Sequence, residues 1–580
     1  MRRSHDPAFV QHYFVGAGLD IGAIEDPLSA HAHLFPRVCN IATWSERQGD
    51  MAQMMGMQDE AFDFVHASHV LADVANPAKA LAKWLELLKP GGHAVVTMPD
   101  EDLYEKGAWP SRFNRRHAAS FTICKPRKLL PHSVNVLEMV QSLSHVASVE
   151  RVSLVRDHYE ESRNDVDQTA RGLAECVIEI VLRKRTVPTA GKMLEALTSA
   201  CSAAASIEAG QCAVRTYPYR FDVYHRTMME WLRWEAEELV DSLWAQCVAL
   251  LPDEHLPRLY QALHAITRGK LQEGFHLRES TVSKFGWQRR TTAQPPATFP
   301  EWKGESLEGK SIVIWSEFGL GDEIFFLRYA RMLREHCGAA YVTVMCQSPL
   351  VSLFRASREA DAVIDVKEAA LLPAHDYWVF PHALPCYMPM DLEALPASVP
   401  FLRAPAASVP ALLTVRPDTL KVGVVFKGAP THENDHARSL PTLAVLDDLF
   451  KLEGAEFFSL QKGAGADEAA QYAQRRSNFH DLGAEIRTMD ETTSVIEKLD
   501  LVLTVDTSVS HVAGAMGKPT WVMLPSYGDW RWHYTREDSP WYPSARLFRR
   551  RFGGDWHEVV ARIRGHLLVQ IDNKKHREAA

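Results

Sequence analysis

The 580-residue sequence predicts a multidomain α/β chain, with parallel sheets and crossover helices towards both ends and helices alone between them. Short apolar runs alternate with amphipathic stretches, except between about 186 and 285. Proline-rich segments at 289–302 and 396–417 interrupt the pattern, because proline disrupts helices and sheet ladders alike. At roughly 100–200 residues per domain, the length allows three to five domains.

The composition excludes several classes of protein. Lys and Arg number 64 and Asp and Glu 73, so the formal net charge of −9 argues against a nucleic-acid binder. No stretch approaches the roughly 20 apolar residues that span a bilayer, so we expect no transmembrane segment. No apolar segment follows the basic start, so we expect no signal peptide. Both expectations favour a cytoplasmic location. The nine cysteines form no CxxC pair, which predicts free thiols and neither disulfides nor a zinc site.

The first domain is expected over residues 1–185, and a helical connector with its proline-rich linker over 186–300. The predicted strands of the first domain lie at 18–22, 62–65 and 93–98, with a helix at 77–88. The connector shows helical spacing at 193–205, 227–250 and 255–266.

Two further parallel-sheet lobes are expected, over residues 301–410 and 411–570. Their apolar strands lie at 311–315, 340–345 and 376–380 in the first lobe and at 421–426, 455–460, 501–505 and 520–524 in the second. Ligands of such lobes bind in a cleft at the carboxyl ends of the strands. The polar tail, 571–580, is expected to be disordered.

The most specific motif is V-D-T-S-V-S-H-V-A-G at 505–514. A buried strand ends in Asp506, Thr507 and Ser508, and a helix begins there with His511 in its first turn. Free N–H groups, hydroxyls and the positive end of a helix dipole favour a phosphate or diphosphate ligand. The alternative is an Asp or Thr N-cap with nothing bound.

Several other segments accompany this motif. They read E-F-G-L-G-D-E-I at 317–324, R-Y at 328–329, R-S at 438–439, S-L-Q at 459–461, and D-W-R-W followed by E-D-S-P-W-Y-P at 529–543. Together they resemble the glycosyltransferase domain that follows tetratricopeptide repeats in many bacterial proteins, which is similar to the family 9 heptosyltransferases of GT-B fold. The resemblance covers about residues 255–565. It implies transfer of a sugar from a nucleotide-diphosphate sugar to a glycan, lipopolysaccharide or protein acceptor, with inversion.

The resemblance places the candidate base at Asp322, where a carboxylate could accept the proton of an attacking sugar hydroxyl. The alternative is that Asp322 is a helix N-cap. Gly319 and Gly321 would let the backbone approach the donor closely. Lys427 and Arg438 could neutralise the leaving diphosphate.

Gln461 ends another strand and is expected at the mouth of the same cleft. No Asp-x-Asp motif stands at a strand end, so we expect transfer without a metal. The aromatic residues Trp530, Trp532, Trp541 and Tyr542 fit sugar stacking and core packing equally well.

A second resemblance concerns about residues 14–185. The segments G-L-D-I-G-A at 18–23, F-D-F-V at 62–65 and L-K-P-G-G at 88–92 are similar to class I S-adenosylmethionine-dependent methyltransferases. The resemblance places Asp20 and Gly22 at the methionine part of the cofactor and Asp50 at the adenine. It places Ser68 and His69 at the end of the fourth strand, beside the point of methyl transfer. The segment 99–105, together with His117, resembles a substrate-side segment of one subfamily.

Three departures concern this cofactor site. Ile24 stands where a second glycine is usual, no acid follows the second strand with Glu46 the nearest, and 69–73 lacks the common Glu-His pair. Two interpretations therefore stay open: an active methyltransferase acting on the same glycan or acceptor, or a degenerate module for acceptor binding or dimerisation. A third is a scaffold in which both domains have lost activity, against which the intact segment 506–511 argues. The sequence indicates neither the donor, the acceptor nor the oligomeric state.

Overall fold

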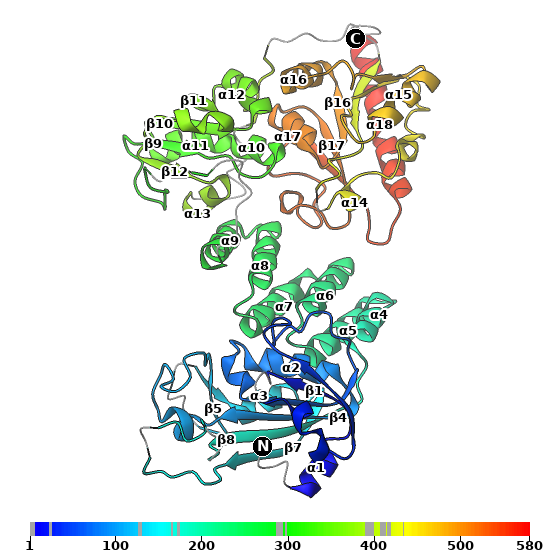
Figure 1. Ribbon diagram of the computed structural model, residues 1–580. Helices are drawn as coiled ribbons and strands as arrows, with labels where there is room; N and C mark the ends of the chain where they lie inside the picture. Colours follow the sequence, from blue (N-terminus) through cyan, green and yellow to red (C-terminus); the bar gives the residue numbers. More distant parts are fainter. Residues whose placement is uncertain are drawn as a thin grey trace. The chain divides into compact units, whose positions relative to one another are not determined.

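The computed structural model describes residues 6–579 except 23–25, 126–129, 131, 164–165, 171–173, 286–293, 296–297, 389–398, 406–412, 414–418 and 433. The chain divides into two compact units, Met1–Leu251 and Pro252–Ala580, which are described separately (Figure 1). Most of both proline-rich segments, and Ile24, lie outside the described residues.

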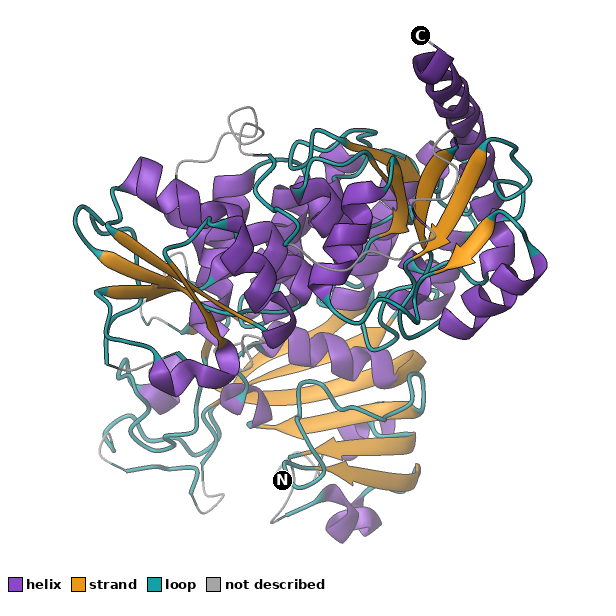
Figure 2. Ribbon diagram, turned by 90° about the horizontal axis from the view of Figure 1, so that it is seen from above, coloured by secondary structure: helices purple, strands orange, loops and turns teal. Residues whose placement is uncertain are grey.

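The first unit is built on a six-stranded sheet of order β2-β1-β3-β4-β8-β7, which Figure 2 shows as one row of strands. The first four strands are parallel, and β8 runs antiparallel to β4 and to β7. Their bounds are β1 Gly16–Ile21, β2 Val38–Trp44, β3 Phe62–Ser68, β4 Leu88–Pro99, β7 Ala147–Val155 and β8 Val177–Lys184. The remaining elements are α1 Pro7–Tyr13, α2 Pro77–Leu87, α3 Val136–Ser142 and a small pair, β5 Ser120–Thr122 and β6 Ser133–Asn135, with short helical turns at Leu28–Leu34, Val70–Asp73 and Glu101–Glu105.

Gly18 allows the centre of β1 to lie against the ring of Phe64 on β3. A Cβ at Gly18 would stand 2.0 Å from Cζ of Phe64, whose side chain is fully buried. We expect Gly18→Ala to lower the free energy of unfolding of this unit by about 1–3 kcal/mol, because the ring has little room to move. Gly191→Ala is the matched control, since nothing lies within 4 Å of the added methyl group. Urea denaturation measures both, and equal stability of the two variants would contradict the packing argument.

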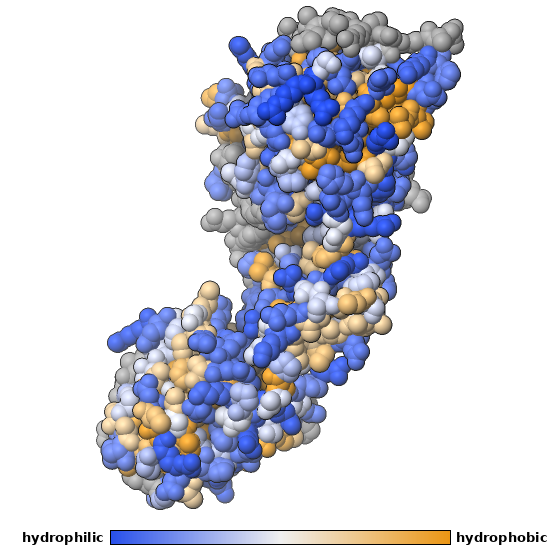
Figure 3. Space-filling model, turned by 90° about the vertical axis from the view of Figure 1, so that its right-hand side faces the viewer, coloured by the Kyte–Doolittle hydropathy of each residue, from blue (hydrophilic) through white to orange (hydrophobic). Residues whose placement is uncertain are grey.

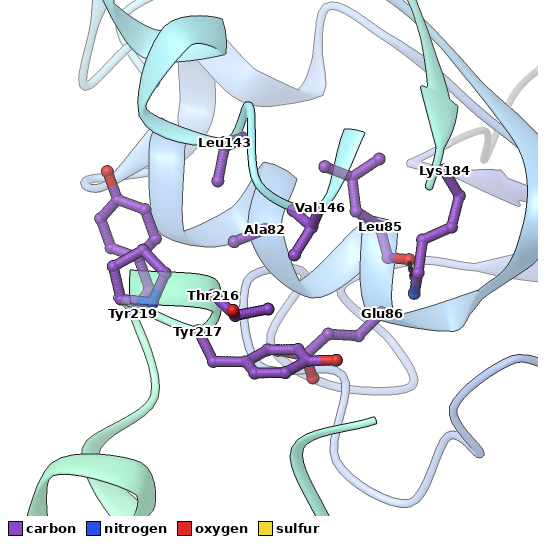
Figure 4. A pocket seen from close by; sticks show the side chains of 10 residues that line it. Ala82, Leu85, Glu86, Leu143, Val146, Lys184, Thr216, Tyr217 and Tyr219 are labelled. Atoms are coloured by element: carbon purple, nitrogen blue, oxygen red, sulfur yellow. Dashed lines mark hydrogen bonds between the residues drawn. The ribbon is translucent and has the colours of Figure 1, made fainter. Parts of the chain in front are cut away.

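The expected connector needs correction, because its helices divide between the two units. Helices α4 Ala190–Thr198, α5 Ala203–Thr216, α6 Phe221–Arg233 and α7 Glu237–Leu250 belong to the first unit. The turn between α5 and α6 packs on the end of α2, where Arg220 Nη1 lies 3.3 Å from Glu86 Oε2. Figure 4 shows the small pocket at this junction, with Glu86, Lys184 and Tyr217 in its lining. Apolar contacts and ion pairs thus attach α4–α7 to the sheet domain.

The second unit contains two parallel sheets. The first has the order β11-β10-β9-β12 and the second β15-β14-β13-β16-β17-β18. The strands are β9 Ser311–Ile314, β10 Tyr341–Cys346, β11 Ala362–Asp365, β12 Tyr377–Val379, β13 Leu420–Val425, β14 Ala455–Ser459, β15 Phe479–Asp481, β16 Leu501–Val505, β17 Thr520–Leu524 and β18 Ala545–Arg549. The helices are α8 His255–Thr267, α9 Leu271–Phe285, α10 Leu320–Phe326, α11 Arg328–Cys337, α12 Val351–Ser357, α13 Leu384–Tyr387, α14 Asp435–Arg438, α15 Ala466–Arg475, α16 Met489–Lys498, α17 Ser508–Ala515 and α18 Trp556–Ala579, with short turns at Ser348–Leu350, Val366–Leu371, Pro381–Ala383, Leu443–Leu446 and Trp530–Trp532. One hydrophobic core joins residues of both lobes with residues of α8 and α9.

The tail expected to be disordered is the last part of helix α18. Ile563, Leu567 and Ile571 on this helix are buried in the core of the second lobe. Lys574 Nζ also lies 3.1 Å from Asp500 Oδ1, so a buried apolar stripe and an ion pair extend the helix into 571–579.

Polar side chains cover most of the face that Figure 3 shows, with smaller apolar areas between them. Within the part of the chain that the structure describes, no helix has both the length and the apolar character needed to cross a membrane.

Candidate functional site

In the second unit, two strands each lead into a helix at the carboxyl edge of their sheet, and these helices meet. Strand β9 leads to α10 in the first lobe, and β16 leads to α17 in the second; the two helices lie side by side (Figure 1). A Cβ at Gly321 would stand only 2.8 Å from Cδ2 of His511, so glycine is needed for this approach. The sequence-predicted residues 319–322 and 506–511 are therefore brought together.

Asp322 closes the first turn of α10 and also holds a buried arginine. Its Oδ2 accepts a hydrogen bond from the backbone N–H of Gly319 at 3.1 Å, and its Oδ1 accepts one from Nη2 of Arg531 at 2.5 Å. The N-cap residue of α10 is Gly319, and Asp322 is the third residue of the helix, where it completes a capping box. The alternative that Asp322 is itself the N-cap is therefore wrong. About a quarter of the Asp322 side chain, 24 %, stays exposed, which leaves this carboxylate accessible beside its cation.

Arg531 lies between two carboxylates, and the sequence prediction did not include it. Its Nη1 bonds Asp529 Oδ1 at 2.9 Å, and its guanidinium stacks 4.2 Å from the centre of the Trp530 ring. Burial alone would lower the pKa of Arg531, but the charges of Asp529 and Asp322 raise it above its ordinary value. Its place inside the D-W-R-W segment was the sequence signal that could have identified it.

Behind Asp322 lies a second buried group, also missed by the sequence prediction. His382 Nδ1 is 2.9 Å from Glu317 Oε2, and its Nε2 is 3.8 Å from Asp322 Oδ1. Arg278 Nη2 of helix α9 lies 3.6 Å from Glu317 Oε1. Burial lowers the pKa of His382, which favours a neutral imidazole between the two carboxylates.

The N-terminus of α17 has no side-chain cap. Thr507 occupies the N-cap position, but its Oγ1 lies 3.2 Å from Oγ1 of Thr504 and makes no capping bond. Among the described residues, the backbone N–H groups of Ser508 and Val509 have no hydrogen-bond acceptor. This end of the helix therefore presents free donors and the positive end of its dipole.

His511 is buried and held in place by an aromatic hydroxyl. Its Nδ1 lies 2.9 Å from the hydroxyl of Tyr542, and its Nε2 lies 4.0 Å from Asp506 Oδ1. Burial, and secondly the charge of Arg531, lowers the pKa of His511 to about 3. His511 is therefore neutral at physiological pH and packs against Gly321 instead of supplying positive charge.

Asp506 follows β16 and is mostly buried, with 15 % of its side chain exposed. Burial, and secondly the charge of Asp529, raises the pKa of Asp506 from 3.8 to about 6. Below about pH 4 the carboxyl is protonated in both folded and unfolded chains, but between about pH 4 and 6 only the unfolded chain releases its proton. Stability from this group is consequently lost as the pH rises through that window.

We therefore expect Asp506→Asn to stabilise the protein at pH 7 by on the order of 2 kcal/mol, with no difference from wild type at about pH 4. Thermal unfolding across this pH range measures the difference. Asp538→Asn is the control of opposite sign, because a hydrogen bond with Arg536 lowers the pKa of Asp538. A destabilised Asp506→Asn variant at pH 7 would contradict the expectation.

The three remaining donor-site predictions have different outcomes. Arg438 is close enough for its charge to lower the pKa of both Asp506 and His511, so it belongs with the helix ends. Lys427 Nζ lies 3.8 Å from Glu468 Oε2, at the end of β13. Gln461 is buried, and its amide makes five hydrogen bonds to backbone atoms of residues 426–427, 462 and 464. Gln461 thus supports the loop of Lys427 and offers no free group to a ligand.

The aromatic residues that accompany the site are core residues. Trp532, Trp541 and Tyr542 are fully buried, and Trp530 is 7 % exposed. Trp530 and Trp541 pack edge to face around Phe325, so the interpretation as core packing is supported.

In the first unit, the cofactor-site residues predicted from the sequence lie at the carboxyl ends of β1 and β3 or in a turn. Gly22 follows β1 with φ of +80°, and a Cβ there would stand 2.3 Å from Cγ2 of Val70. Asp20 is buried and engaged through both oxygens, by the backbone N–H of Leu28 and by Nδ1 of His66, each at 2.7 Å. Asp50 forms an exposed turn by accepting the N–H of Ala52 at 2.6 Å.

Ser68 and His69 end the third strand of the chain and not the fourth. The reason is that residues 45–61 form turns, without any strand assigned there. His69 has a φ of +64°, and its buried Nε2 has no hydrogen-bond partner among the described residues. Burial, and secondly the charge of His117, lowers the pKa of His69 to about 4.

A buried pair of hydrogen-bonded side chains, His117 and Glu105, lies near His69, in the segment that follows the neighbouring strand β4. His117 Nδ1 is 2.6 Å from Oε1 of Glu105, and both side chains are almost fully buried. Because β3 and β4 are parallel neighbours, their carboxyl ends place His69 and the pair at one edge of the sheet.

Comparisons with known proteins agree with this division. Residues 7–128 match the family model of a methyltransferase domain. Residues 458–553 match that of glycosyltransferase family 9 (heptosyltransferase). The chain carries a methyltransferase domain and a glycosyltransferase family 9 domain. Both resemblances inferred from the sequence, and the expectation of an enzyme, are thereby confirmed.

Individual relatives are distant. The chain is 25 % identical over 359 residues to Protein FlbA of Caulobacter vibrioides, covering 56 % of this chain and 58 % of FlbA. The heptosyltransferase II structure from E. coli, described as an ADP-heptose LPS enzyme, is 17 % identical with a TM-score of 0.32, over 47 % of this chain and all of that one. A putative methyltransferase from Bacillus halodurans is 11 % identical with a TM-score of 0.21, over 31 % of this chain and 96 % of that chain.

Proposed function

We propose that the second unit transfers a sugar from a nucleotide-diphosphate sugar to a hydroxyl of a glycan, lipid-linked or protein acceptor. The observation that carries the proposal is the meeting of the α10 and α17 N-termini around Asp322, with Arg438 beside them. Helix N-termini and arginines bind anions, and a carboxylate beside them can accept a proton.

The roles of the individual groups follow from their places. The free N–H groups of α17, with Arg438, would hold the diphosphate, and Lys427 would add charge at the neighbouring strand end. Asp322 would take the proton of the acceptor hydroxyl. The hydroxyl oxygen would form the bond to the anomeric carbon while the nucleoside diphosphate leaves from the opposite face. This is an inverting displacement, and the positive groups of the chain compensate the leaving charge without requiring a metal.

A screen with UDP-, GDP-, dTDP- and ADP-sugars tests this function. We expect calorimetry to detect binding of the sugars of one nucleotide class. We also expect slow hydrolysis of that donor, which releases the nucleoside diphosphate, in the presence of EDTA. If none binds, or if release requires added Mg²⁺ or Mn²⁺, the corresponding part of the proposal fails.

A second candidate function, S-adenosylmethionine binding, belongs to the first unit. The tight turn at Gly22, with its positive φ, and the unpartnered Nε2 of His69 support it, whereas the engaged carboxylates of Asp20 and Asp50 fit the cofactor less well. Bound S-adenosylmethionine would supply a methyl group. The fit is thus partial, and we propose binding without deriving a methyl-transfer step.

Calorimetry with S-adenosylmethionine separates the two interpretations of this domain. Micromolar binding that is lost in Gly22→Ala supports a functional cofactor site. Gly56→Ala is the control, because Gly56 has a similar φ of +87° and nothing within 4 Å of its Cβ position. Absence of binding to the wild-type chain supports a degenerate module.

A further inference from the structure

Three potential metal ligands converge in the first unit, away from both sites described above. They are His12 of α1, His93 of β4 and Glu150 of β7, whose ligand atoms all lie within 4.8 Å of one another. Nε2 of His93 lies 3.6 Å from Oε2 of Glu150. Three elements that are distant in the sequence thus direct ligand atoms to one point.

The backbone contributes to this convergence at Glu150. The pairing of β7 with β8 shifts register between Val149 and Arg151, so Glu150 is the extra residue of a β-bulge. A bulge redirects the side chain of the strand, and bulges are common next to functional sites. In a regular strand Glu150 would pair with a residue of β8. Here it is unpaired in the bulge, and its side chain reaches past β8 to His93 on β4.

Helix α1 is fixed by its own apolar face, which positions His12. Phe9 and Val10 of α1 are buried in a cluster that includes Phe64 of β3 and Val95 of β4. The ring of Tyr13 packs edge-on against His93, with ring centres 5.2 Å apart. The helix therefore holds His12 near the sheet independently of any ligand.

The donor set suits a divalent transition metal. Two imidazoles and one carboxylate are ligands that Zn²⁺ takes at about 2.0–2.2 Å, commonly with a water in the fourth position. A neutral imidazole is the form that binds metal, and Arg183, which pairs with His93 between β8 and β4, opposes an incoming cation.

We propose that His12, His93 and Glu150 bind a zinc-like divalent ion that clamps α1 to β4 and β7. His93 pairs with Phe64; Phe64 lies four residues before the end of β3 and His93 six residues before the end of β4, so the pair is roughly 13–20 Å from their carboxyl edge. The ion would therefore be structural and separate from the edge proposed for S-adenosylmethionine. The expected metal independence of sugar transfer concerns the second unit and is not affected.

Calorimetric titration of the full chain with Zn²⁺, after removal of metals with EDTA and dialysis, tests the proposal. We expect one site of micromolar affinity or tighter. The affinity for Zn²⁺ should fall at least tenfold in each of His12→Gln, His93→Ala and Glu150→Gln. His480→Ala is the matched control, because His480 lies 2.6 Å from Glu456 and no three-ligand group includes it among the described residues. Binding only at millimolar concentration, or binding that the three variants leave unchanged, would overturn the proposal.

A thermal shift supplies a second readout. Zn²⁺ should raise the melting temperature of the wild-type chain and of His480→Ala but not of His12→Gln. His12 is exposed, so this variant keeps its fold even where His93→Ala does not. An equal shift in wild type and His12→Gln would contradict a clamp at α1.

Discussion

Asp322→Asn is expected to lower the rate of sugar transfer about 10²- to 10⁴-fold, the range typical for loss of a general base. The asparagine oxygen can still accept the N–H of Gly319, so the first turn of α10 is retained. What disappears is the negative charge beside Arg531 and the capacity to accept a proton from the acceptor hydroxyl. Binding of the nucleotide should change little, because the free N–H groups belong to α17.

Single-turnover transfer with the donor found in the nucleotide-sugar screen, together with calorimetry of nucleotide binding, measures both quantities. Asp538→Asn is the control, since this exposed carboxylate pairs with Arg536 at 2.6 Å away from the helix ends. Undiminished transfer by Asp322→Asn would remove Asp322 from the role of base. An equal loss of nucleotide binding would indicate that its charge holds the site together instead.

The strands and the helix ends were predictable because their signals are local. Apolar runs of four to six residues indicate buried parallel strands, and the polar residues directly after them indicate the carboxyl edge. Hence the segment 506–511 could be selected from its own pattern, and Gly319 and Asp322 from the resemblance to family 9 glycosyltransferases; the structure brings them together.

The partners of these residues could not be predicted in the same way. Arg531 is 209 positions from Asp322, and only the packing of the two lobes shows that they form an ion pair. His382 has no neighbouring motif, and its place behind Asp322 depends on the fold of the first lobe. Gln461 looks like a ligand-binding residue at a strand end, but buried backbone groups take its hydrogen bonds.

The domain boundary and the tail were mispredicted for a related reason. Helical spacing identifies α4–α7 and α8–α9 as helices but does not show which sheet they pack against. In the tail, polar composition hides the apolar stripe that Ile571 continues from Ile563 and Leu567. Both errors concern long-range packing, on which composition carries little information.

Arg531→Met is expected to lower the free energy of unfolding by about 3 kcal/mol, near the lower end of the range for breaking a buried ion pair. The arginine side chain is only 5 % exposed and lies between Asp322 at 2.5 Å and Asp529 at 2.9 Å. Methionine fills similar space against Trp530 and Phe325, so the loss comes mainly from Asp322 and Asp529, which are left without their cation.

Guanidinium denaturation of the second unit's transition in the full chain measures this effect. Arg536→Met is the matched control five residues away, where the arginine is 43 % exposed and its partner Asp538 is 68 % exposed. A surface pair of this kind contributes up to about 1 kcal/mol, so the two variants should differ by about 2 kcal/mol or more. If they are equally stable, Arg531 does not hold the helix ends together through its charge. The slower transfer by Asp322→Asn would then reflect only the loss of a group that accepts the proton. Breaking the ion pair between Asp322 and Arg531 would not contribute, because that pair would add no stability to the site.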